Sequence, residues 1–318
     1  MVVCVRLDEA YRRPVADAGT WQAETIRSLT EAGLDPAEVA AVIDLSLAED
    51  FRDGPDVTTT STVPADAVGE VVIASRQDGV LSGAPVAMAV FDAVSAGRVS
   101  GEAVADGTPL SPGTVAISLR GPMTDILMAE RTALNLLGHL TGVASATRRW
   151  VQAVAGTGAR IRDTRKTLPG LRDLEKYAVR CGGGVNHRMS LGDAALIKDN
   201  HVASAGSVAA AIEAVRRVAP QVPMEVEVDD LAQFDEAVAA GAGLIMLDNF
   251  SIADTVEAVR RRDAVAPTVK LEASGGLTLD RAAEVAATGV DFIAVGALTH
   301  SAPVADLGLD VRSVRRPG

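Results

Sequence analysis

From residue 160 onward, short apolar or β-branched runs alternate with helix-like segments, and this alternation constrains the fold more than any other feature. Parallel strands need a long crossover between them, and a helix is the usual one. The sequence therefore predicts a parallel sheet, either a barrel or a doubly wound sheet. The six expected strands lie near residues 159–162, 194–198, 223–228, 243–247, 268–272 and 291–296.

Polar residues follow nearly every run, at the point where the strand should end. The ends read R-D-T-R-K, K-D-N-H, E-V-E-V-D, L-D-N-F, L-E-A-S-G-G and V-G-A. Barrel enzymes place their reactive groups at the carboxyl ends of successive strands. No G-x-G-x-x-G or Walker motif follows any of these runs, so the dinucleotide and P-loop folds lack support. We therefore predict a fold of class α/β plus α+β, with an incomplete TIM-like α/β barrel of six or seven strands.

The residues before this alternation have a different texture. Asp35 as N-cap and Pro36 at the first helical position predict a helix. Short β-type runs separated by turn sequences then fill residues 57–119, which predicts a separate, sheet-containing domain. A long helical stretch follows at about residues 123–154, and we expect an interruption near residues 138–142, where two glycines stand.

The chain is thus divided into five predicted parts. A poorly ordered extension begins it, and a tail with one more β-like segment ends it by returning to the first domain. The parts are the extension at 1–21, an N-terminal α/β sandwich domain at 22–130, a bridging helix at 131–155, the barrel at 156–300 and the tail at 301–318.

Residues 160–198 form a basic island in an acidic chain. Nine Lys or Arg stand against four acids there, a local charge of +5, whereas the whole chain carries −12. Such confined charge favours a small multi-anionic ligand held in one cleft, because affinity for polyanions in general would need a spread patch. Three of the nine, Arg172, Lys176 and Arg180, recur every four residues, and we interpret them instead as an exposed helix face.

Composition excludes several functional classes. No apolar run approaches the roughly 20 residues that a membrane span needs, and no apolar core of a secretory signal follows the N-terminus, so we expect a cytoplasmic protein without a membrane partner. The two cysteines, Cys4 and Cys181, stand in unrelated contexts, which argues against a disulfide framework or a thiolate metal site. Aromatic residues make up 3% of the chain, too few for a nucleic-acid stacking surface.

Acids and glycines at the strand ends suggest the chemistry. Glu225 and Glu227 are two apart on one expected strand and so face the same side, and Asp248 ends the next strand. Buried carboxylates need a cation, a proton, a metal or a ligand, and the basic island can supply the counter-charge. A closed internal salt-bridge network is the alternative. Glycine-rich turns at residues 274–276 and at Gly296 follow the last two strands, where TIM barrels commonly bind phosphate, although a double glycine can also be a simple turn.

These motifs, in this order, resemble the quinolinate phosphoribosyltransferase family over roughly residues 22–311. The resemblance implies conversion of quinolinate and phosphoribosyl pyrophosphate to nicotinate mononucleotide, carbon dioxide and pyrophosphate, with Mg²⁺. It also implies a homodimer or higher homo-oligomer with shared active sites. The matching stretches are E-R-T-A-L-N at 130–135, D-T-R-K-T-L-P-G-L-R at 163–172, K-Y-A-V-R-C-G-G-G-V-N-H-R at 176–188, L-I-K-D-N-H at 196–201, E-V-E-V at 225–228, L-D-N-F at 247–250, S-G-G-L at 274–277 and V-G-A-L-T-H-S at 295–301.

The resemblance also assigns roles to residues, three of which, Lys166, Glu227 and Asp248, are expected to be catalytic. Thr164 is carried over as a substrate-binding residue. The remaining assignments are Arg131, Arg165, His187, Arg188 and Lys198 for the quinolinate carboxylates, Lys166 and Lys198 for the phosphoribosyl substrate, Glu227 and Asp248 for the ribose hydroxyls and Mg²⁺, and Ser274, Gly275, Gly276 and Gly296 for the 5′-phosphate.

Physical chemistry agrees with these assignments and leaves three rivals. Carboxylates stabilise an oxocarbenium-like state during displacement of pyrophosphate, and Arg suits the planar dianion quinolinate. One rival is the family's molybdenum-associated group of paralogues. Another is a phosphosugar barrel enzyme, such as an aldolase with Lys198 as Schiff-base amine. The third is a regulatory barrel that binds a phosphorylated metabolite without turnover.

Overall fold

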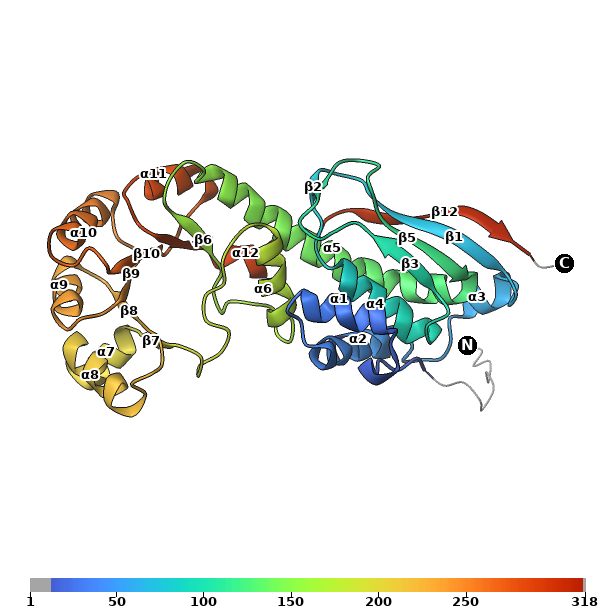
Figure 1. Cartoon of the computed structure of the whole chain (residues 1–318), viewed down its shortest axis with the longest axis horizontal. Coiled ribbons are helices and arrows are strands. Elements are labelled where there is room, and N and C mark those ends of the chain that lie inside the picture. The colour runs from blue at the N-terminus through green and yellow to red at the C-terminus, as the bar shows by residue number, and fades with distance from the viewer. Residues whose placement is uncertain (1–12, 317–318) are drawn as a thin grey trace, which may run out of the picture. The chain divides into compact units, whose positions relative to one another are not determined.

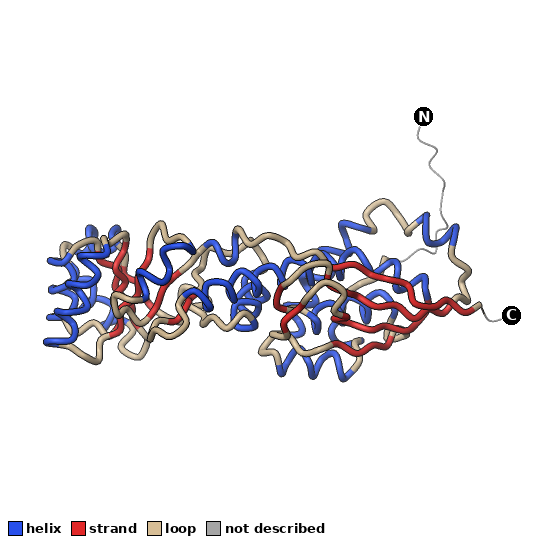
Figure 2. The backbone as a smooth tube through the Cα atoms, turned by 90° about the horizontal axis from the view of Figure 1, so that it is seen from above, coloured by secondary structure: helices blue, strands red, loops and turns tan. Residues whose placement is uncertain are grey.

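The computed structural model describes residues 13–316, and the chain divides into two compact units (Figures 1 and 2). Unit 1 comprises Met1–Ser145, Pro169–Cys181 and Ala302–Gly318, and unit 2 comprises Ala146–Leu168 and Gly182–Ser301. The predicted barrel segment 156–300 therefore differs from unit 2, because residues 169–181 cluster with unit 1.

Part of the predicted N-terminal extension has a defined structure. Arg13 forms an ion pair with Asp44 at 2.9 Å, the 3-10 helix η1 spans Ala18–Thr20, and Trp21 is buried. Residues 13–21 are thus ordered, contrary to the prediction. The rest of the predicted extension, residues 1–12, lies outside the described residues.

Unit 1 contains an antiparallel sheet with the strand order β12-β1-β5-β3. The last strand of the chain, β12, pairs along the whole of β1, so the tail joins the N-terminal sheet (Figure 1). Together with its helices this sheet makes the predicted mixed α/β domain. The strands are β1 (Val68–Ser75), β3 (Ser100–Ala103), β5 (Val115–Pro122) and β12 (Leu307–Arg315), beside a small ribbon of β2 (Gly79–Val80) and β4 (Pro109–Leu110).

Helix α2 begins as predicted, whereas α4 was missed. Asp35 accepts a hydrogen bond from the Ala37 amide at 2.9 Å and caps α2. Helix α4 follows Gly83, which offers no capping side chain, and the distant Asp106 accepts from the Gly83 and Ala84 amides instead. A cap supplied from another segment leaves no local signal. The helices of unit 1 are α1 (Ala23–Glu31), α2 (Pro36–Asp50), α3 (Val57–Thr62), α4 (Ala84–Ser95), α6 (Arg172–Cys181) and the first part of α5 (Met123–Ala153).

Helix α5 runs without the interruption that we predicted at its glycines. Gly138 and Gly142 instead make room for the segment that leads into β12. A Cβ atom on Gly142 would stand 2.1 Å from the Pro303 carbonyl oxygen, and the Ala305 amide donates to the Gly138 carbonyl at 2.9 Å. The two glycines therefore serve a close backbone approach rather than a helix break.

Helix α6 also corrects the interpretation of its charges. Lys176 is fully buried, whereas Arg180 is exposed. Every residue from 174 to 179 is buried, so this part of the helix is covered on all sides and its period-four charges do not mark a solvent face.

Unit 2 contains a parallel sheet with the strand order β6-β11-β10-β9-β8-β7, which confirms the six predicted strands. Within the described ranges no ladder joins β6 to β7, so the sheet curves without closing into a barrel. The strands are β6 (Arg160–Arg162), β7 (Ala195–Ile197), β8 (Met224–Val228), β9 (Leu244–Asp248), β10 (Lys270–Ser274) and β11 (Phe292–Ala294).

Helices cover the outer face of this curved sheet (Figure 1). The main ones are α8 (Val208–Val218), α9 (Leu231–Ala239) and α10 (Ile252–Val265), and the short ones are α7 (Asp199–Ala205), η2 (Leu279–Arg281), α11 (Ala282–Ala286) and α12 (Ala297–His300). No helix between residues 13 and 316 is long and apolar enough to cross a membrane.

Candidate active site

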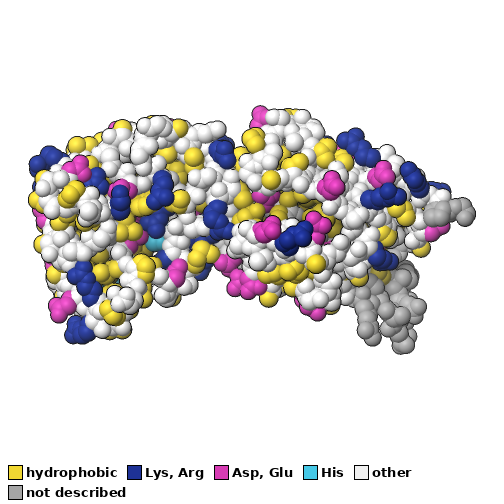
Figure 3. All heavy atoms as spheres, in the orientation of Figure 1, with side chains coloured by type: hydrophobic (Ala, Val, Ile, Leu, Met, Phe, Trp, Pro, Cys, Tyr) yellow, Lys and Arg dark blue, Asp and Glu magenta, His cyan; other side chains and the backbone are white. Residues whose placement is uncertain are grey.

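The carboxyl ends of the unit 2 strands surround a cavity of about 600 Å³. Polar side chains from β8, β9 and β10, and from the segments that follow β6 and β7, line it. Eleven residues predicted from the sequence are among these: Thr164, Arg165, Lys166, His187, Arg188, Lys198, Glu227, Asp248, Ser274, Gly275 and Gly276. In the space-filling view, basic side chains border a recess over unit 2, with a histidine visible inside it (Figure 3).

Two guanidinium groups in this cavity each have one buried donor without an acceptor. The Nε atoms of Arg165 and Arg188 are both buried, and neither has a hydrogen-bond partner among the described residues. Burial, and then the charge of Arg165, lower the pKa of the Arg188 guanidinium. Arg188 Nη1 is fixed by donating to the Ala194 carbonyl at 2.9 Å. Two half-buried arginines, each with a buried Nε donor that lacks an acceptor, form a binding site for an anion with more than one acceptor group.

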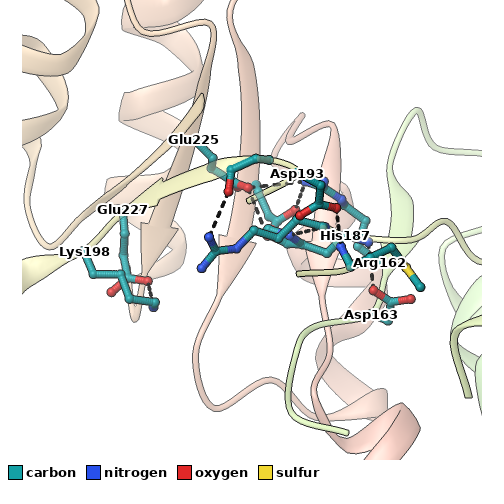
Figure 4. Close-up of polar contacts among 11 residues, drawn as sticks. Arg162, Asp163, His187, Asp193, Lys198, Glu225 and Glu227 are labelled. Atoms are coloured by element: carbon teal, nitrogen blue, oxygen red, sulfur yellow. Dashed lines mark hydrogen bonds and ion pairs between the residues drawn. The ribbon is translucent and has the colours of Figure 1, made fainter. Parts of the chain in front are cut away.

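Acidic groups stand at the neighbouring strand ends. Lys198, directly after β7, forms an ion pair with Glu227 on β8 (Figure 4). Asp248 ends β9 and accepts from the Asn249 side-chain amide at 2.7 Å. Carboxylates and cations therefore alternate around one cavity, which suits a substrate that carries both hydroxyl groups and anionic groups.

The glycine turn after β10 has a conformation that other residues rarely adopt. Gly275 and Gly276 have φ angles of 94° and 57°. A Cβ atom on Gly275 would stand 2.2 Å from the Asn249 side chain, whereas one on Gly276 would meet nothing within 4 Å. The turn thus leaves open space beside Gly276. The helices that follow are short, with three residues in η2 and five in α11.

Two predicted residues do not line this cavity. Gly296 lies close behind it, because a Cβ atom there would stand 3.0 Å from the Lys166 side chain and 3.4 Å from the Thr164 hydroxyl. Arg131 is an exposed residue of α5 in unit 1. The structure therefore brings together every candidate except Arg131.

The buried residues His187, Glu225 and Glu272 form an ionic cluster with the half-buried Arg162. Figure 4 labels three of the four, Arg162, His187 and Glu225. Arg162 Nη1 is 2.6 Å from Glu272 and 3.7 Å from Glu225, and its guanidinium stacks on the Phe292 ring. Glu225 thus belongs to an internal network, the alternative left open by the sequence, whereas Glu227 faces the cavity.

His187, Glu225 and Glu272 are close enough to hold a metal ion, with ligand atoms within 4.8 Å of one another. Arg162 opposes this, because its guanidinium already occupies the carboxylates with a positive charge. We therefore interpret the cluster as an ion-pair network.

Sequence reasoning missed Glu272 and Asn249. The available signal for Glu272 was that it is an acid within a predicted buried strand. In the structure it is in register with Met246, which in turn pairs with Glu227. For Asn249 the signal was its position directly after a strand, where Asn tolerates the left-handed φ of 54° found here. The apolar lining residues Leu196, Met246 and Ala294 were also not predicted, although they lie on or beside predicted strands.

We expect unit 2 to become less stable as the pH rises from about 5 to about 8. Burial raises the pKa of Glu225 and Glu272 to about 7, from 4.5. The folded protein then binds the pair's proton more tightly than the unfolded chain does. This stabilisation is complete below pH 4.5 and is lost as the pH passes through about 7, a loss of roughly 3 kcal/mol for one proton.

Urea unfolding of unit 2, followed at several pH values, measures this effect. The Glu272→Gln variant cannot titrate at this position and should show a flatter dependence. An unchanged slope in the variant would assign the pH dependence to other groups.

Replacing Arg188 by Lys should weaken substrate use while keeping the charge. An ammonium group cannot reproduce the planar fork of a guanidinium on a carboxylate. We expect a loss in kcat/KM of roughly 1.5–3 kcal/mol, about 10- to 150-fold. Steady-state kinetics with a circular-dichroism check of folding measures it, and a folded variant with wild-type kcat/KM would remove Arg188 from the site.

Comparison with known proteins adds independent findings. A family model described as the N-terminal domain of quinolinate phosphoribosyl transferase matches residues 56–141, and one described as the C-terminal domain matches residues 143–310. The nicotinate-nucleotide pyrophosphorylase [carboxylating] of Mycobacterium leprae (strain TN) is 54% identical over 270 residues, which cover 84% of this chain and 94% of that protein. The protein of the same name from Rattus norvegicus is 37% identical over 279 residues, covering 87% and 92%.

Solved structures agree. The structure of the nicotinate-nucleotide pyrophosphorylase from Francisella tularensis superposes with a TM-score of 0.81 at 36% identity. It covers 87% of this chain and 96% of that one.

Proposed function

The chain belongs to the quinolinate phosphoribosyltransferase family, and on that premise we propose that the unit 2 cavity catalyses phosphoribosyl transfer to quinolinate. The enzymes of this family are carboxylating nicotinate-nucleotide pyrophosphorylases of NAD biosynthesis. The reaction joins the ribosyl carbon of phosphoribosyl pyrophosphate to the ring nitrogen of quinolinate. Pyrophosphate leaves, and one quinolinate carboxylate is released as carbon dioxide, which gives nicotinate mononucleotide.

The observation that carries this proposal is the pair of buried arginine Nε atoms without acceptors, Arg165 and Arg188. Quinolinate has two adjacent carboxylates in one plane, and each can accept from a guanidinium fork. Uncompensated buried donors are costly, so a ligand that satisfies both would bind with a favourable contribution from each. A monocarboxylate would leave one of the two sites unsatisfied.

The remaining lining residues suit the phosphoribosyl substrate. Glu227 and Asp248 would bind the ribose hydroxyls and stabilise positive charge on the ribosyl carbon as the bond to pyrophosphate breaks. Lys166 and Lys198 would neutralise the departing pyrophosphate. The Lys166 backbone is held in place, because its amide donates to the Thr164 hydroxyl and its carbonyl accepts from Thr299. The glycine turn at 274–276, with Gly296, would take the 5′-phosphate.

The residues present also fit Mg²⁺. Glu227 and Asp248 offer carboxylate oxygens at the ends of adjacent strands, the donor type that Mg²⁺ prefers alongside substrate phosphates and water. When bound there, Mg²⁺ would neutralise charge on the pyrophosphate group.

We further propose a cytoplasmic homodimer or higher homo-oligomer with shared active sites. Arg131 supports sharing, since it lies exposed in unit 1 while the other candidates line the unit 2 cavity or stand directly behind it. A phosphorylated, membrane-impermeant substrate and the presence of only two cysteines support the cytoplasm.

Activity should require a divalent cation and both carboxylates of quinolinate. We expect at least about a 100-fold preference for quinolinate over nicotinate, since a site built for a polar group rejects analogues that lack it. The assay follows loss of quinolinate and release of carbon dioxide with phosphoribosyl pyrophosphate and Mg²⁺. Full activity in excess chelator, or comparable turnover of nicotinate, would contradict the proposal.

A further inference from the structure

The geometry points to a role for His187 that differs from direct contact with quinolinate. We propose that His187 is a positioning residue that holds Arg188 in place, and that the buried acids Glu225 and Glu272 anchor it. The inference rests on the proposed function, because it assumes that Arg188 binds a quinolinate carboxylate. Within that site it assigns substrate contact to Arg188 and positioning to His187.

Both ring nitrogens of His187 are directed at the protein: Nδ1 through a hydrogen bond, and Nε2 as a buried atom close to two acids but outside hydrogen-bond geometry. Nδ1 accepts a hydrogen bond from the Arg188 backbone amide at 2.7 Å. Nε2 lies 2.9 Å from Glu225 Oε2 and 3.8 Å from Glu272 Oε1. Because Nδ1 accepts this hydrogen bond, the ring hydrogen belongs on Nε2, facing the acids.

The acids close to His187 lie on strands of the parallel sheet. Glu225 lies on β8 and Glu272 on β10, and Arg162 on β6 bridges them. On the other side of the histidine, Asp163 accepts from the His187 backbone amide at 2.8 Å and from the Asn186 side chain at 2.5 Å. All four acids and bases around His187 belong to strands or directly follow them, so the loop at 185–188 is fixed to the sheet (Figure 4).

The backbone of the loop at 185–188 is also hydrogen-bonded to β6 and to Asp163, which follows β6. The Val185 amide donates to the Ile161 carbonyl at 2.8 Å, and the Asp163 amide donates back to the Val185 carbonyl at 3.3 Å. His187 is thus held by the sheet, and its ring in turn fixes the backbone of the next residue by accepting from the Arg188 amide. The Arg188 side chain, whose Nε has no acceptor, is then held toward the cavity. In this arrangement His187 affects quinolinate only through Arg188.

Two substitutions at His187 separate the two roles. The Asn side chain places an acceptor near the position of Nδ1, whereas the Gln side chain places a donor near that of Nε2. If His187 positions Arg188, His187→Asn should stay within about three-fold of wild type in the quinolinate KM, and His187→Gln should raise that KM about ten-fold. The KM for phosphoribosyl pyrophosphate should stay unchanged in both. The opposite order, with Gln the better substitute, would indicate a direct Nε2 contact with substrate.

A double-mutant cycle gives a second test. Residues that act through one another lose little when combined, so His187→Gln with Arg188→Lys should lose at most about two-fold more kcat/KM than Arg188→Lys alone. Fully multiplicative losses would overturn the proposal. If the Gln variant fails to fold, Asp163→Asn, which alters the carboxylate that accepts from the His187 amide, replaces it in the cycle with Arg188→Lys, and the same two outcomes apply.

A matched control isolates general effects of a disturbed ion pair. Asp291 precedes β11 at the opposite end of the sheet and accepts from Arg262 and from the Leu271 amide, each at 2.9 Å. Asp291→Asn should lower the unfolding temperature without changing the quinolinate KM. If Asp291→Asn raised the quinolinate KM as much as His187→Gln does, the effect at His187 would be one of overall stability, and the proposal would be wrong.

The tautomer of His187 can be measured without turnover. The chain has four histidines, and the ¹⁵N shifts of His187 can be assigned by their loss in His187→Asn. We expect the Nε2-protonated form both in the free wild-type protein and with saturating quinolinate. A change of tautomer or protonation on binding would overturn the proposal. Wild-type protein without any quinolinate turnover would instead contradict the proposed function and leave this measurement valid.

Discussion

A mixture of two inactive variants, Arg131→Ala and Lys166→Ala, should regain about a quarter of wild-type activity when the two are refolded together. Each variant alone should be at least about 100-fold less active, because each removes a charged partner of an anionic substrate. The reason for recovery is symmetry. If Arg131 serves the site of the neighbouring chain, a mixed dimer carries both lesions in one site and leaves the other intact. Random pairing makes about half the dimers mixed, each with one good site of two.

Affinity tags on the two variants allow the mixed dimers to be isolated and assayed. Refolded wild type sets the scale, and each variant refolded alone sets the background. Confirmed mixed dimers without activity above that background would show that Arg131 serves its own chain or no site at all.

The Gly142→Ala variant should lose at least about 4 kcal/mol of unfolding free energy, and much of it should not fold. In an ordinary helix this change stabilises by about 1 kcal/mol. Here the new methyl group would stand 2.1 Å from the Pro303 carbonyl oxygen and 3.3 Å from the Val304 Cα atom. These are backbone atoms, and the Gly138–Ala305 hydrogen bond holds the segment in place, so the overlap is relieved only by moving the whole approach to β12.

Thermal unfolding of three variants tests this explanation. Gly138→Ala, where the nearest atom would be the Ala305 carbonyl oxygen at 2.9 Å, should be destabilised less than Gly142→Ala. Gly158→Ala, where nothing lies within 4 Å, should be near neutral. Equal behaviour of all three would show that the tail segment moves freely away from α5.

The residues that could be predicted are those whose signal is local. A strand of unit 2 shows itself as an apolar run followed by polar residues, and the cavity arises because parallel strands bring those ends together. Lys166, Lys198 and Asp248 were found in this way. Asp35 with Pro36 likewise predicts a helix start that the structure confirms.

What could not be predicted depends on distant partners. The cap of α4 comes from Asp106, the two glycines of α5 make room for Pro303 and Ala305, and Lys176 is buried although its sequence spacing suggested an exposed helix face. Glu225 and Glu227 have the same strand pattern, yet one faces Arg162 and the other Lys198. Such differences arise from packing between distant segments, and the spacing of apolar and charged residues along the sequence cannot predict that packing.

The pairing of β12 with β1 has a consequence for synthesis of the chain on the ribosome. Residues 68–75 emerge early, but the strand that covers their edge, Leu307–Arg315, is nearly the last to be made. All of unit 2 is translated in between. Until then the β1 edge has unpaired backbone groups and can pair with another nascent chain. Unit 1 can thus complete its sheet only after translation has almost ended, whereas the sheet of unit 2 is complete in the polypeptide before β12 appears.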